Sequence, residues 1–336
     1  MKMKTVLSLI AVISLVAALT PGVAFAAEDP TTGTFTCANS APSVSAVALY
    51  TTANATTETM NPQTEYYVKV GVSDANTLDD LNTVKVWIYW DEDGTFNSAN
   101  KVDPGNTQTG AIFTWTNANP DTWAIDPSAS TSWALGSCIA PTLTGASGDF
   151  KFYFTPGMVA KESPDADEWH IYVEAFDGGA TANSSQENLN MNWYGEIDVI
   201  TTDVNWGDVD PGQVFAEDAP SENGSISVKY TANGNYSEQV AALGTWNGTG
   251  ANSATLDATE NVSNANQFSL RADDTDTMGS HVTVDTTSNY KTIDDAGTIT
   301  AETGNTEATN SLWIKLSTTF VADTYSGTIY YQIANR

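Results

Sequence analysis

The chain has 336 residues, with 41 Asp and Glu against 12 Lys and Arg, two histidines, two cysteines and a formal net charge of −29. This acidic balance argues against nucleic acid and against anionic lipid as partners, since both select basic surfaces. Two histidines leave little for His-based catalysis or a multi-His metal centre. The length predicts two domains. The abundance of Asp, Thr, Asn, Ser and Gly argues against a mostly helical fold.

Residues 1–26 have the three parts of a secretory signal peptide. Lys2 and Lys4 precede an apolar run from Val6 to Leu19, and Ala24-Phe25-Ala26 supplies a small-x-small end. A membrane anchor is the alternative, but about 20 apolar residues are needed to span a bilayer and this run is shorter. A type IV pilin would be cleaved before the run, where nothing suggests a site. We expect cleavage after Ala26, secretion, and no membrane insertion after cleavage.

The mature chain is expected to open with a polar, Thr-rich extended arm, residues 27–43, followed by a first domain over residues 44–195. In this domain apolar and polar residues alternate with a period of two, which is typical of β-strands. The expected strands are Val44–Tyr50, Tyr66–Val72, Val84–Trp90, Phe150–Phe154 and Trp169–Ala175. Polar loops are expected over residues 91–110 and 117–148.

A second domain is predicted over residues 196–336, after a polar stretch from Thr181 to Asn190. A strand at Trp193–Ile200 lies in the boundary region 190–205, before a new start at Val204. The same alternation then predicts strands at Ile226–Tyr230, Phe268–Leu270, Val282–Val284, Leu312–Leu316 and Ile329–Ile333. The Thr/Asn/Gly-rich segment 231–266 is expected to form exposed loop. The fold class is therefore all-β, with two tandem β-sandwich (Ig-like) domains.

Cys37 and Cys138 are the only cysteines. In an oxidising compartment two cysteines most simply form one disulfide, and two buried free thiols are the alternative.

Six Asn-x-Ser/Thr sequons mark possible glycosylation sites if the host glycosylates. They begin at Asn54, Asn183, Asn223, Asn235, Asn247 and Asn261.

Two stretches resemble known modules of secreted proteins. The segment YYVKVGVSDANTLDDLNTVKVWIY, residues 66–89, resembles Ig-like repeats of archaeal and bacterial surface proteins. The stretches VNWGDVDPGQ, SISVKYTANGNYSEQVAA and TYSGTIYYQI are similar to a recurring β-sandwich module of envelope proteins. Such families include S-layer components, adhesins and subunits of extracellular filaments. In some filaments an N-terminal arm inserts as a missing strand into the next subunit.

Clusters of aspartates are candidates for Ca²⁺, which takes six to eight oxygen ligands from bent loops. The candidate ligands are Asp91, Asp93, Asp273, Asp274 and Asp276. The alternative is that each Asp caps its own turn. No cofactor is required by the sequence, and Ca²⁺ is the one that it suggests.

Trp87 and Tyr89 lie on the strand face opposite Val84, Val86 and Ile88, so they point outward if the valine face is core. With Trp115, Trp123 and Trp133 they are candidates for stacking on sugar rings. Packing under a loop is the alternative. His170 is expected to face solvent on the same argument.

The sequence therefore predicts a secreted structural protein of the cell envelope. Copies would associate through sheet edges into a filament or surface layer, with the arm as a donated strand and Ca²⁺ as a stiffener. The alternative is an adhesin or carbohydrate-binding module that recognises surface glycans. An enzyme is not expected, because no G-x-S-x-G elbow, H-E-x-x-H helix or phosphate loop is present.

Overall fold

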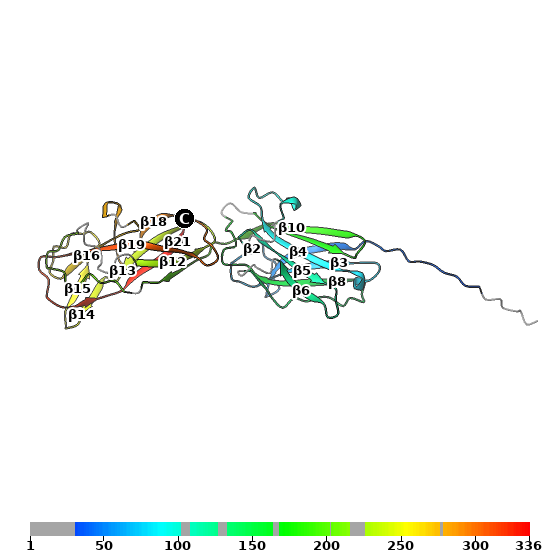
Figure 1. Cartoon of the computed structure of the whole chain (residues 1–336), viewed down its shortest axis with the longest axis horizontal. Helices are drawn as coiled ribbons and strands as arrows, with labels where there is room; N and C mark the ends of the chain where they lie inside the picture. Colours follow the sequence, from blue (N-terminus) through cyan, green and yellow to red (C-terminus); the bar gives the residue numbers. More distant parts are fainter. Residues whose placement is uncertain are drawn as a thin grey trace, which may run out of the picture. The chain divides into compact units, whose positions relative to one another are not determined.

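The computed structural model describes residues 31–101, 108–126, 133–163, 168–201, 203–215, 226–275 and 278–336. Residues up to Ala38 belong to one compact unit and Asn39–Arg336 to another, and each is described by itself. The predicted signal peptide lies outside the described residues. The second unit is all-β, as predicted, and holds two sandwiches with separate cores (Figure 1).

The first sandwich packs a four-stranded sheet against a six-stranded one. The four-stranded sheet has the order β1 (Ser43–Thr51), β3 (Tyr66–Ser73), β8 (Ser147–Thr155), β7 (Ala134–Leu135). The six-stranded sheet has the order β2 (Thr59–Met60), β10 (Thr181–Met191), β9 (Trp169–Phe176), β4 (Thr83–Trp90), β5 (Gly110–Thr116), β6 (Thr122–Asp126). Two short 3₁₀ helices, η1 (Leu78–Asp80) and η2 (Ser98–Asn100), lie in its connections.

The core of the first sandwich forms from the apolar faces of the predicted strands. Val84, Val86 and Ile88 of β4 are fully buried, and so are Phe150 and Phe152 of β8. These side chains alternate with outward residues because successive residues of a strand point to opposite faces. The alternation in the sequence thus located the core correctly.

The second sandwich packs an eight-stranded sheet against a three-stranded one. The larger sheet has the order β11 (Gly195–Val199), β12 (Ile226–Ala232), β19 (Asn305–Leu316), β16 (Gln267–Asp273), β15 (Ser253–Leu256), β14 (Thr245–Gly248), β20 (Tyr325–Ser326), and β17 (Val282–Thr283) pairs with β16. The smaller sheet has the order β18 (Lys291–Gly297), β13 (Tyr236–Ala242), β21 (Ile329–Asn335). The 3₁₀ helix η3 spans Met278–Ser280.

Two predicted loops and the polar stretch before the second domain contain strands. The segment 231–266 holds β13, β14 and β15, the segment 117–148 holds β6 and β7, and the polar stretch 181–190 is most of β10. Strand β10 forms by pairing with β9 on one side and β2 on the other, so its hydrogen bonds do not depend on an apolar face. Its Gln186 accepts a hydrogen bond from the Leu49 N–H through Oε1 at 2.6 Å.

Asn233 holds the connection between β10 and β11. It is fully buried, and its Nδ2 donates to the carbonyls of Ala160 at 2.7 Å and Asn192 at 2.9 Å. Its Oδ1 accepts from the N–H of Tyr194 at 2.6 Å. One amide therefore satisfies two backbone groups of this connection and the carbonyl of Ala160 in the segment after β8.

Candidate functional site

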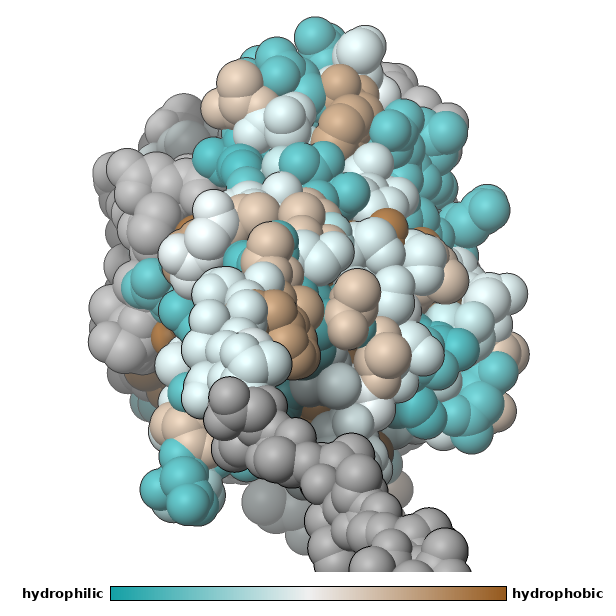
Figure 2. Space-filling view, turned by 90° about the vertical axis from the view of Figure 1, so that its right-hand side faces the viewer, coloured by the Kyte–Doolittle hydropathy of each residue, from teal (hydrophilic) through white to brown (hydrophobic). Residues whose placement is uncertain are grey.

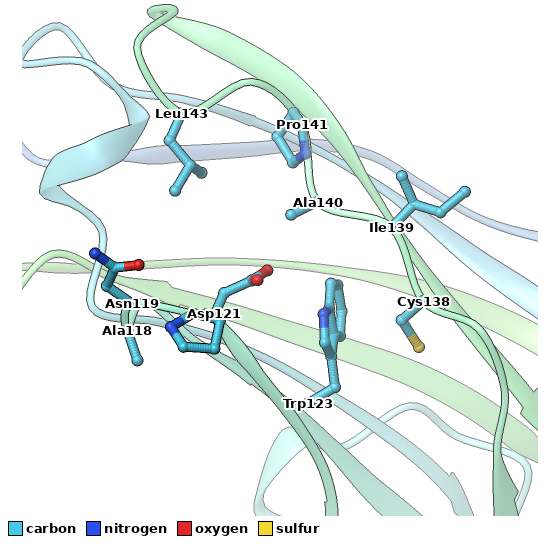
Figure 3. Close-up of a pocket in the computed structure, with 10 residues that line it drawn as sticks. Ala118, Asn119, Asp121, Trp123, Cys138, Ile139, Ala140, Pro141 and Leu143 are labelled. Atoms are coloured by element: carbon cyan, nitrogen blue, oxygen red, sulfur yellow. The ribbon is translucent and has the colours of Figure 1, made fainter.

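A hollow of the first sandwich lies where both of its sheets end. Strand β6 is the last of the six-stranded sheet, and β7 is the last of the four-stranded sheet. Beyond β7 the chain runs along β8, with Ile139 and Lys151 exchanging backbone hydrogen bonds at 2.9 Å. Between this segment, Cys138–Leu143, and the start of β6 lies a groove of about 570 Å³ (Figure 3).

The groove is lined mainly by apolar side chains. Figure 3 shows the Trp123 ring rising from β6 toward the Cys138–Leu143 segment, with Leu143 and Ala140 on the opposite side. Trp123 also packs edge-on against Phe152 of the core, with ring centroids 5.0 Å apart. Its indole therefore forms one wall of the groove and also covers part of the core.

Asp121 is the one ionisable acid among the groove's lining residues, and its carboxylate is engaged. It accepts a hydrogen bond from the indole Nε1–H of the buried Trp115 at 2.9 Å. The sequence carries no charged residue between Asp126 and Asp149, the stretch that supplies the opposite wall. The groove is thus a weakly charged site on a strongly acidic protein.

The described part of the arm, residues 31–38, has no regular secondary structure and is exposed. Its Phe35 side chain is 93% exposed, the highest value among the large hydrophobic residues of the described chain. The arm therefore presents an aromatic side chain to solvent.

The two outward aromatics of the sequence analysis are covered by the loop after β4. Tyr89 is fully buried and donates its hydroxyl to the carbonyl of Asn97 at 3.1 Å. The Lys101 ammonium lies 4.6 Å from the Trp87 ring and 4.1 Å from that of Tyr172, and pairs with Glu174 at 2.9 Å. Packing, rather than an open stacking platform, describes this face.

Two further expectations about aromatic and histidine side chains need correction. His170 is fully buried, 5.5 Å from the Tyr89 ring and 5.7 Å from Phe96, because the same loop covers the face on which it lies. Trp115 and Trp133 are core residues. Of the candidate stacking residues, Trp123 alone lines the groove.

The predicted calcium ligands form no cluster of three in the described residues, where no group of three or more His, Cys, Asp or Glu is placed to hold a metal ion. Asp93 caps its own turn by accepting from the Thr95 N–H at 2.8 Å, and Asp91 accepts from Asn100 Nδ2 at 3.0 Å. Asp276 lies outside the described residues.

Asp273 and Asp274 are brought together at the end of β16. Burial, the hydrogen bond to Asp273 and the nearby charge of Asp294 raise the pKa of Asp274 to about 6. Burial opposes ionisation of Asp273 as well, but hydroxyl and amide donors, Ser280 foremost at 2.6 Å, hold its pKa below the usual value. This pair is the place where a cation would relieve repulsion.

Five of the six sequon asparagines are described, and all five are exposed: Asn54, Asn183, Asn235, Asn247 and Asn261. Asn223 lies outside the described residues. Exposure is the first requirement for a glycosylated asparagine.

The predicted disulfide is not present in the structure. Cys37 and Cys138 are both free thiols, Cys37 exposed and Cys138 partly buried. The prediction treated the two residues as parts of one putative domain, whereas Cys37 belongs to the unit that ends at Ala38. Burial raises the pKa of the Cys138 thiol to about 11.

Comparisons with known proteins add little. No family model and no curated protein matches this chain. Among solved structures, a 35 kDa C-terminal fragment of the major pilin GBS80 of Streptococcus agalactiae is 11% identical, with 86% of this chain and 91% of that chain covered and a TM-score of 0.23. We draw nothing further from a TM-score of this size. Within the described residues, no helix has the length and hydropathy needed to cross a membrane.

Proposed function

We propose that this protein is a secreted structural subunit of the cell envelope, which associates with further copies of itself through the edges of its sheets. The observation that carries the proposal is the groove between β6 and Cys138–Leu143, where both sheets of the first sandwich end beside an apolar, weakly charged hollow. An unprotected sheet edge is a template for pairing with another chain. Natural proteins that stay monomeric usually blunt such edges with charge.

The surface around such contacts must also permit close approach. Figure 2 shows pale and brown residues over the middle of one face, with the hydrophilic residues more frequent toward its margins. Large, strongly acidic proteins repel one another, so contacts between copies are expected where charges are sparse.

The test is microscopy and sedimentation of protein recovered from an export host, with its N-terminus read by mass spectrometry. Filaments, sheets or oligomers of the chain that begins at Ala27 support the proposal. A chain that begins at Asn39 and lacks residues 27–38 of the arm is expected to remain dispersed. Monomers of the longer chain at every concentration, with and without Ca²⁺, would refute the proposal.

Calcium remains part of this proposal at one place, the Asp273–Asp274 pair. Burial and the charges of Asp273 and Asp294 oppose ionisation of Asp274, and a bound cation would reduce this cost at neutral pH. Ca²⁺ bound there would stiffen the end of β16. Urea unfolding of the wild type and Asp274→Asn with and without Ca²⁺ tests it.

Glycan binding is the second candidate function, and one observation favours it. Trp123 presents its indole to the groove beside the exposed residues Asn119 and Asp121, and a flat aromatic with polar neighbours suits a sugar ring. A glycan array bound by the wild type and lost on Trp123→Ala, but kept on Trp87→Ala, would support this function. Trp87 is the matched control because Lys101 covers its ring.

A further inference from the structure

Phe35 is an aromatic side chain that the described chain leaves exposed. A single exposed apolar residue is normal on a protein surface, but a phenylalanine left 93% exposed loses nearly all the stabilisation that its burial would give. Its neighbours Thr34 and Thr36 share its preference for extended strands. The segment is therefore suited to add to a sheet edge and to bury one aromatic ring when it does.

The groove offers the complementary features. Strand β6 ends its sheet in the described chain, so its outer edge pairs with no described strand. The hollow beside that edge is larger than one side chain and contains Ile139, which is 49% exposed. An added strand along β6 would place alternate side chains in the groove, since residues of a strand alternate between faces.

Charge selects the arm as the occupant. The sequence has no charged residue between Asp29 and Glu58, and none between Asp126 and Asp149. In a chain of net charge −29, most pairs of surface segments from two copies repel each other. Residues 31–38 and the Cys138–Leu143 wall carry no charge, so they can meet at low electrostatic cost. On the β6 side the carboxylates are Asp121, which accepts from the Trp115 indole, and Asp126 at the end of the strand.

We propose that the groove between β6 and Cys138–Leu143 binds residues 31–38 of a second copy, with the Phe35 ring entering beside Trp123 and Ile139. The proposal rests on the proposed function, because it names the partner of the same sheet edge. It assigns the contact to two short segments, and a single substitution in either segment is expected to weaken the contact.

The first experiment is sedimentation equilibrium of four variants beside the wild type. Phe35→Ala removes the ring, and Ile139→Asp puts a charge into the groove at an exposed position that does not carry the core. Their matched controls are Thr32→Ala in the arm and Val321→Asp, whose side chain is 46% exposed in the second sandwich. We expect Phe35→Ala and Ile139→Asp each to weaken association at least tenfold, and the two controls to leave it unchanged.

Mixing the two variants tests the pairing directly. The intact arm of Ile139→Asp and the intact groove of Phe35→Ala are expected to combine into a one-to-one dimer that grows no further. Unchanged association of either variant would overturn the proposal. A mixture that stays monomeric would also overturn it, because neither variant can bind its own arm and the one intact arm would then have failed to bind the one intact groove.

A peptide separates this proposal from the function on which it rests. A fluorescein-labelled peptide of residues 29–42 is expected to bind Phe35→Ala protein but not Phe35→Ala/Ile139→Asp, as measured by fluorescence anisotropy. The same peptide with Phe35→Ala is the control. If the peptide binds Phe35→Ala protein while the wild type is monomeric, self-assembly is refuted and recognition of the arm by the groove is supported. Equal binding to both proteins, or no binding, would overturn that recognition even where the wild type assembles.

Discussion

Asp274 gives a stability prediction whose size depends on pH. Its pKa is raised from the ordinary value of 3.8 to about 6, mainly by burial and then by Asp273 and Asp294. A raised acid pKa means that the folded state holds the proton more tightly than the unfolded state. Its contribution to stability is therefore full below about pH 4 and is lost as the pH rises through about 6.

The magnitude follows from the shift. Two pKa units correspond to roughly 3 kcal/mol at most. Because the Asp274 side chain is only partly buried, solvent screening reduces the cost at neutral pH to about 1 kcal/mol. Asp273 has a lowered pKa, so its contribution is lost only as the pH falls below the usual range for Asp. Measurements between pH 4.5 and 7.5 therefore report mainly on Asp274.

The assay is urea unfolding of the wild type and Asp274→Asn at pH 4.5 and 7.5. We expect the variant to be about 1 kcal/mol more stable at pH 7.5 and close to the wild type at pH 4.5. Asp198→Asn is the matched control, since it removes one negative charge at an exposed position of β11. A gain that is the same at both pH values, or that Asp198→Asn reproduces, would refute the reasoning.

The same variants test calcium. If the pair binds Ca²⁺, millimolar Ca²⁺ at pH 7.5 stabilises the wild type, by about 2.7 kcal/mol at a hundredfold excess over Kd, and leaves Asp274→Asn unchanged. Equal responses of the two proteins would remove calcium from this site.

Three further predictions concern the thiols and two buried amides. Iodoacetamide at pH 8 is expected to label Cys37 well before Cys138, and the rate of labelling at Cys138 should rise about tenfold per pH unit toward its pKa of about 11. Peptide mass mapping measures both rates. If neither cysteine reacts until the protein is reduced, the two form the disulfide instead. Asn233→Ala should cost about 2–4 kcal/mol in urea unfolding, because it removes three hydrogen bonds of a fully buried amide, and a cost below 1 kcal/mol would contradict their role. Asn310→Leu removes the amide that donates to the buried Glu238 and should cost about 2–4 kcal/mol, part of which Glu238→Leu in the same chain should restore; a double variant no more stable than Asn310→Leu would contradict this account.

The sequence predicted those strands that have one apolar, buried face and one polar or aromatic face. In β4 the alternation of Val84, Val86 and Ile88 with polar or aromatic residues marks the core face directly, and the structure buries all three. The polar strand β10 was not predicted, because its pairing with β9 and β2 supplies its stability and leaves no apolar period to detect. Edge strand β6 was missed for a similar reason, since only Trp123 and Ile125 alternate in it.

The site was harder to predict because it depends on what covers each face. Trp87, Tyr89 and His170 lie on the strand faces opposite the core. Because successive residues of a strand point to opposite faces, the sequence pattern predicts that these three side chains face solvent. The loop from Asp91 to Lys101 then covers them, and period-two patterning contains no information about this packing.

Charge patterning did contain a usable signal for the groove. The two uncharged stretches, between Asp29 and Glu58 and between Asp126 and Asp149, are visible in the sequence, but nothing there shows that the second forms the wall of a groove. The sheet order supplies this, because it ends both sheets of the first sandwich beside Cys138–Leu143. An acidic protein that must bind copies of itself needs contact segments free of repulsion, whereas one that must stay monomeric gains from charge at every open edge. The absence of charge from the Cys138–Leu143 wall therefore argues for association at this groove, and Ile139→Asp is expected to act by adding repulsion to that wall.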